Sequence, residues 1–121
     1  MANIIGIGGV FIRARDRDAL AAWYEKHLAI PDGTQGFWEA SGGPMVFAAF
    51  ESDSVYFPRE QRVMINFRVD DLDGVKARLE EDGIEVIVDP AWDGDGSFGR
   101  FARIHDPEGN AIELWEPPEA E

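Results

Sequence analysis

The 121-residue chain contains no cysteine and two histidines. The lack of cysteine excludes disulfides, thiol catalysis and every metal site that needs a cysteine ligand. Basic residues are also scarce, since 11 Lys and Arg stand against 24 Asp and Glu and give a formal net charge of −13. Nucleic acids and anionic membranes are bound through basic surfaces, so this charge argues against both as partners.

Long hydrophobic runs are missing as well. No stretch approaches the ~18 apolar residues of a membrane span, and the first residues lack the basic start and apolar core of a signal peptide. We therefore expect no membrane segment and a cytoplasmic location. Aromatic residues, in contrast, are plentiful, with eight Phe and four Trp. They are sufficient to build a core or to line a cleft for an organic ligand.

Residues 9–25 and 64–80 form an internal repeat. Each copy begins with apolar residues in alternation, which predict a strand. An aspartate follows at the position of a helix N-cap, Asp16 in the first copy and Asp71 in the second. Apolar residues at helical spacing come next. The repeat therefore predicts a strand followed by a capped helix in each half of the chain.

Further short strands are expected after each helix. They are predicted at 36–40, 45–51 and 53–57 in the first half, and at 84–88, 99–104 and 111–116 in the second, with a long polar loop at 89–97. The predicted fold is a single α+β domain over residues 1–121. It consists of two βαβββ modules, about 4–58 and 61–117.

The two modules, the segment from Asn66 to Asp73 and the closing segment from Asp106 to Trp115 resemble the vicinal-oxygen-chelate (VOC) superfamily. This group contains glyoxalase I, bleomycin-resistance proteins and extradiol dioxygenases. The resemblance implies that the two modules form a curved mixed sheet around one cleft. It also implies a homodimer, and, in catalytic members, a divalent metal held by four side chains, usually His, Glu, His and Glu.

This sequence has a ligand-type residue at only one of the four metal-ligand positions of the superfamily. Glu113 stands at the last ligand position, whereas the other three positions fall on Gly9, Phe47 and Met64. A catalytic metal site normally needs at least three protein ligands. We therefore expect no cofactor, and we regard a divalent metal as disfavoured.

Strand alternation, counted from the ligand positions, predicts which side chains face the cleft. They are Glu113, Phe11, Arg13, Phe47, Met64, Asn66, Arg68, Phe101, Arg103 and Trp115. The planar guanidinium groups would suit a small organic ligand that carries a carboxylate.

Several interpretations of Glu113 stay open at this point. It could form an internal ion pair with Arg13, Arg68 or Arg103, act in ligand binding or as a general base, or retain weak metal binding. The loop that carries Tyr56 could cover the cleft or contact a second subunit.

Three functions are compatible with these features. The first is a glyoxalase-like small-molecule-binding protein, which could also act as a metal-independent lyase or isomerase on a small oxygenated metabolite, with Glu113 as the catalytic residue. An enzyme of this kind would be similar to lactoylglutathione lyase. The second is a non-catalytic protein that sequesters a drug or metabolite, like the bleomycin-resistance proteins. The third is a dimeric scaffold or regulatory module with an empty cleft.

Overall fold

The computed structural model describes residues 2–33 and 36–119. Within them lie, in chain order, α1 (Arg17–Leu28), β1 (Ile65–Arg68), α2 (Leu72–Glu81), α3 (Pro90–Asp93), β2 (Arg100–His105) and β3 (Ala111–Glu116). The protein is a mixed α+β structure with a small open sheet. None of the helices in the described ranges is long and apolar enough to span a bilayer.

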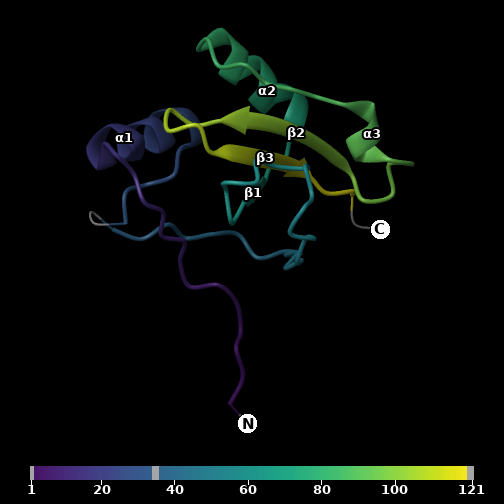
Figure 1. The fold of residues 1–121 in the computed structure, drawn as a ribbon, viewed down its shortest axis with the longest axis horizontal. Coiled ribbons are helices and arrows are strands. Elements are labelled where there is room, and N and C mark those ends of the chain that lie inside the picture. Colours follow the sequence, from purple (N-terminus) through teal and green to yellow (C-terminus); the bar gives the residue numbers. More distant parts are fainter. Residues whose placement is uncertain (1, 34–35, 120–121) are drawn as a thin grey trace.

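The sheet has the order β1-β3-β2 (Figure 1). The central strand β3 pairs in parallel with β1 and antiparallel with β2. The chain between the parallel strands β1 and β3 contains α2, α3 and β2, so β3 is the last strand in sequence but the central strand of the sheet. β1, β2 and β3 confirm the strands predicted near 64–69, 99–104 and 111–116.

Two aspartates begin the longer helices, as the sequence predicts. The side chain of Asp16 accepts a hydrogen bond from the Ala19 amide at 3.1 Å, and that of Asp71 accepts one from the Gly74 amide at 3.0 Å. These bonds satisfy backbone N–H groups that have no partner within the first helical turn. Gly83, with φ of 83°, follows the end of α2 in a left-handed conformation that glycine adopts without steric cost.

The hydrophobic core lies between α2 and one face of the sheet. Leu72 and Leu79 of α2 are fully buried there, and α1 adds partly buried side chains at its edge. The sheet and the following segment contribute Val86, Ala102, Ile104, Ile112 and Leu114. Every second residue of β2 and β3 thus faces the helices, which leaves the alternate residues on the opposite face.

The first half of the chain differs from the prediction. Over residues 2–33 and 36–64 the structure contains α1 but none of the strands predicted near 9–13, 36–40, 45–51 and 53–57. The residues before α1 extend away from the sheet, and those after it run along the side of the sheet opposite α2 (Figure 1). A strand needs a neighbour to bond its amides and to cover its apolar side chains, and these segments lie beside no such neighbour. A three-stranded sheet does not establish two βαβββ modules.

The segment between α2 and β2 also corrects the prediction. The strand expected at 84–88 is reduced to a single antiparallel bridge between Ile87 and Arg103. The loop expected at 89–97 contains α3, which begins because Asp89 caps it through the Ala91 amide and Pro90 stands at its first position.

Candidate functional site

The strand register brings three predicted cleft residues into one row. Asn66 of β1, Glu113 of β3 and Arg103 of β2 are direct partners across the sheet. Residues that face each other in this way project from the same face of a sheet. Arg103 and Glu113 are buried, with exposed fractions of 8% and 7%. Two oppositely charged side chains therefore lie in the interior, on the face turned away from α1 and α2.

The Glu113 carboxylate is held by two neutral donors. Oε1 accepts a hydrogen bond from the Asn66 side-chain amide at 2.7 Å, and Oε2 accepts one from the Tyr56 hydroxyl. Burial raises the pKa of Tyr56 well above its ordinary value, and the adjacent Glu113 raises that pKa further, so Tyr56 is a neutral donor. Within residues 2–33 and 36–119 Glu113 forms no ion pair, which differs from the internal salt bridge considered from the sequence.

Arg103 lies between two aromatic rings. Its guanidinium carbon is 5.0 Å from the centre of the Tyr56 ring and 5.1 Å from that of Trp92, within the range of cation–π attraction. One terminal nitrogen donates to the Tyr56 carbonyl at 2.8 Å. The buried Nε has no hydrogen-bond partner in the described part of the chain. A buried N–H without an acceptor is costly, and a ligand oxygen could supply one.

A second row lies one step further along the same face. It consists of Arg68, Trp115 and Phe101, which are again direct partners. The rings of Phe101 and Trp115 stack with centres 6.1 Å apart, and the indole N–H of Trp115 donates to the Phe98 carbonyl at 2.7 Å. Arg68 donates to the carbonyls of residues 41 and 44, at 2.6 and 2.5 Å. Arg68 thereby ties the preceding segment to the sheet.

The predicted cleft residues of the first half do not join this face. Phe11 and Phe47 are 96% and 93% exposed, and Arg13 is also exposed. Met64 directly precedes β1 and is partly buried. The structure thus brings together the cleft residues predicted on β1, β2 and β3, whereas those of residues 2–33 and 36–62 lie apart from them.

The donor set does not fit the divalent metal of catalytic VOC members. Gly9, Phe47 and Met64, at three of the four ligand positions, supply no imidazole or carboxylate. Both oxygens of Glu113 already accept hydrogen bonds. In the described residues no three His, Asp or Glu side chains lie close enough to share a metal ion. We therefore derive no chemistry through a metal.

Sequence reasoning did not assign Tyr56 and Trp92 to the site. The sequence predicts a loop around Tyr56 that could cover the cleft, and a polar loop around Trp92. A signal for Trp92 was present, because Asp89 followed by Pro90 is the pattern of a helix start. The contact of Tyr56 with Glu113 depends on the path of an irregular segment and has no sequence signal.

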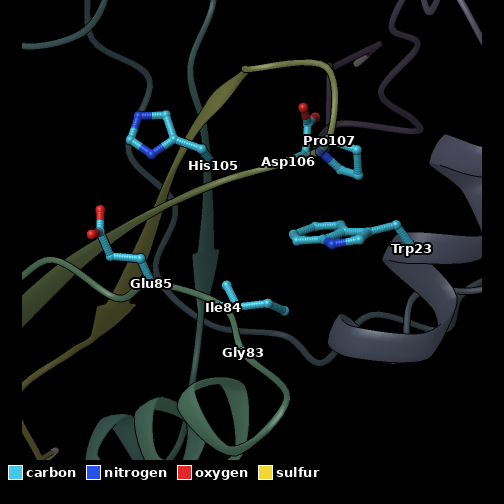
Figure 2. Close-up of a pocket in the computed structure, with 7 residues that line it drawn as sticks. All are labelled: Trp23, Gly83, Ile84, Glu85, His105, Asp106 and Pro107. Carbon is cyan, nitrogen blue, oxygen red and sulfur yellow. The ribbon is translucent and has the colours of Figure 1, made fainter.

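A separate hollow of about 290 Å³ lies near the helices. Figure 2 shows Trp23 extending from α1 toward the space bordered by Ile84 and Pro107, with Asp106 beside them. The Asp106 carboxylate is engaged by four protein donors, including the Tyr24 hydroxyl at 2.7 Å. This carboxylate has a structural role, and the hollow contains none of the residues of the Glu113 row.

Comparisons with known proteins agree with this fold. The chain matches the family described as Glyoxalase-like domain over residues 9–115, which is most of its length. It belongs to that family, and so to the VOC superfamily, as the sequence motifs predict.

A solved structure is similar to this chain: TnmS3, an antibiotic binding protein from Streptomyces sp. CB03234. The TM-score is 0.53 and the sequence identity is 24%, with 95% of this chain and 100% of TnmS3 covered. At that identity the likeness establishes the fold. The comparison with curated proteins gives no match.

Proposed function

We propose that the protein binds a small organic molecule on the sheet face that carries Glu113, without a metal and without converting the ligand. The observation that carries this proposal is the buried pair of Arg103 and Glu113, in which Arg103 retains an N–H without an acceptor. A few fixed polar groups among aromatic side chains are typical of ligand sites. The similar structure of an antibiotic binding protein supports binding as a use of this fold.

The chemistry of Arg103 favours a ligand with a carboxylate or a similar anion. Its guanidinium has five N–H donors in a planar fork, and Nε, which has no partner in the described part of the chain, can donate one more hydrogen bond. The net charge of −13 repels anions at long range, so the attraction for an anionic group would come from direct contact with Arg103.

A thermal-shift screen of carboxylate-bearing metabolites tests the binding proposal. We expect at least one compound to raise the Tm of the wild-type chain, because a ligand that binds only the folded state stabilises it by mass action. The increase should disappear in Arg103→Lys, which keeps a charge but loses Nε. It should persist in Arg100→Lys, because Arg100 lies on the same strand but pairs with Asp73. A screen without hits, or equal losses in both variants, would contradict the proposal.

Metal content tests the metal-free part of the proposal. We expect no stoichiometric Zn, Ni, Fe or Mn after gentle purification, because Glu113 is the one family ligand position that carries a ligand residue. Elemental analysis that finds one metal ion per chain, lost in Glu113→Gln, would overturn this expectation.

A metal-independent lyase or isomerase is the second candidate function. It is favoured by the position of Glu113, where a buried carboxylate beside a phenol could accept and return a proton. NMR spectra of each binding compound, recorded over hours with the protein, distinguish the two functions. Conversion that is lost in Glu113→Gln identifies an enzyme, whereas unchanged ligand spectra support sequestration.

We also propose that the chain forms a homodimer. Large apolar side chains of the first half are exposed, among them Ile4, Phe11, Phe37 and Phe47. Exposed apolar surface on this scale marks an interaction site. A second copy is the occupant we propose, in line with the resemblance to the VOC superfamily.

A further inference from the structure

The Tyr56 side chain occupies the centre of the proposed binding face. Its hydroxyl donates to Glu113, its ring lies beneath the Arg103 guanidinium at 5.0 Å, and its edge meets the Trp92 ring with centres 6.2 Å apart. The Phe50 ring is a further neighbour, with 5.6 Å between the ring centres. Tyr56 therefore makes the set of contacts that a bound phenol would make.

The groups that receive this phenol are more firmly fixed than Tyr56 itself. Asn66, Arg103 and Glu113 project from three hydrogen-bonded strands and are held in one row by the register. Tyr56 belongs to a segment without helix or strand, between α1 and β1. Because the sheet does not depend on the Tyr56 side chain for its backbone bonds, a ligand ring can replace that side chain without unfolding the strands.

Charge restricts what can take the place of Tyr56. Both oxygens of Glu113 act as acceptors, toward Asn66 and toward Tyr56, so the replacing group must offer a hydrogen-bond donor. A carboxylate at this point would lie against the Glu113 carboxylate and be repelled. An aromatic hydroxyl offers the donor, and its ring offers the face that Arg103 contacts.

We infer that the site binds a ligand through a hydroxyaryl group, which displaces Tyr56 and donates its hydroxyl hydrogen to Glu113. This inference rests on the proposed binding function and names the chemical class of one part of the ligand. An anionic part of the same ligand would be held by Arg103. Tyr56 thus fills the hydroxyaryl position until a ligand competes for it.

Chemical rescue tests the inference with p-cresol, which is the tyrosine side chain as a free molecule. We expect the variant Tyr56→Ala to bind p-cresol at least about tenfold more tightly than the wild-type chain does, because the competing side chain is gone. It should also prefer p-cresol over toluene by about tenfold, the effect of a hydrogen bond to a charged acceptor. Isothermal titration calorimetry measures both ratios, and circular dichroism verifies folding.

Phe50→Ala is the matched control. It opens a gap in the same aromatic cluster but removes no hydroxyl, so any binding there should not distinguish p-cresol from toluene. Equal affinity of Tyr56→Ala for the two compounds, or no binding to a folded Tyr56→Ala, would overturn the inference. Either result leaves the Arg103-dependent screen unaffected, so the two proposals fail separately.

A second measurement follows binding in the wild-type chain and uses a variant only to assign the signals. The chain has two tyrosines, so fluorotyrosine labelling gives two fluorine signals, which Tyr56→Phe assigns. Saturating p-cresol should shift the Tyr56 signal toward that of solvent-exposed tyrosine and leave the Tyr24 signal in place. An unmoved Tyr56 signal at saturation contradicts displacement.

Discussion

At the scale of the residue, three carboxylates on β3 and the turn before it show how surroundings decide the role of a side chain. Glu113 is buried on the sheet face and accepts from an amide and a phenol. Asp106 organises the turn between β2 and β3. Glu108 accepts from the backbone amides of Arg15 and Asp16, at 3.0 and 2.9 Å, and so joins the turn to the start of α1.

Glu108 predicts a pH dependence of stability. The backbone amides of Arg15 and Asp16, and then the Arg15 guanidinium, hold the pKa of Glu108 below its ordinary value. A carboxyl whose pKa is lower in the folded chain stabilises the fold above its unfolded pKa of about 4.3, and this contribution is lost as the pH falls through the folded pKa. Glu108→Gln should therefore lower the free energy of unfolding at pH 7 and have a smaller effect at pH 3.

Urea unfolding at both pH values checks this prediction. Glu60→Gln, at an exposed carboxyl, is the control and should change the two midpoints little. Equal effects of Glu108→Gln at pH 7 and pH 3 would show that the charge of Glu108 contributes nothing.

At the scale of the element, the close approach of β2 and β3 requires a glycine. Gly99 directly precedes β2 with φ of 100°, and a Cβ there would lie 2.1 Å from the carbonyl oxygen of Glu116. Gly96 also has a positive φ, of 84°, but a Cβ there would meet no atom within 4 Å. A side chain at Gly96 would therefore cause backbone strain alone, whereas one at Gly99 would cause both strain and a steric collision.

We predict that Gly99→Ala destabilises the protein by more than about 3 kcal/mol, because strain and collision add and the collision is with backbone. Gly96→Ala should cost about 1–2 kcal/mol, the strain of a left-handed alanine alone. Urea unfolding gives both values. Equal destabilisation in the two variants would show that β2 moves away from Glu116 at little cost.

At the scale of the whole molecule, the two halves of the chain differ in what they bury. The described residues after 64 contribute nine of the ten buried apolar side chains, and Leu20 of α1 is the other. The apolar side chains around residues 4–12 and 37–50 are largely exposed. A single copy therefore leaves these two stretches of the first half largely uncovered, which is the physical basis for the proposed homodimer.

Sedimentation equilibrium should give about twice the chain mass of 13.5 kDa. A charged residue in the exposed apolar surface should favour the monomer, so we expect Phe11→Asp or Phe47→Asp to lower the measured mass. Val88→Asp, at an exposed apolar residue of the second half, is the control and should leave the mass unchanged. A monomeric wild-type chain contradicts the dimer.

The sequence by itself determined the class of fold, the starts of the two longer helices and the strands that surround Glu113. These features are local: an aspartate caps the helix that follows it, and alternation places Asn66, Phe101, Arg103, Glu113 and Trp115 on one face once the strands form. The match to the Glyoxalase-like domain family agrees with the resemblance seen in the sequence motifs.

Only the tertiary structure decided what surrounds Glu113. A carboxylate among arginines could have paired with any of them, and the choice depends on which backbone segment passes over the sheet. The segment that passes there carries Tyr56, which bonds Glu113 and leaves Arg103 Nε without an acceptor. The strands predicted in the first half are absent from its described residues because they also depend on tertiary structure. Alternating apolar residues favour a strand, but a neighbouring strand must be present to bond its backbone amides.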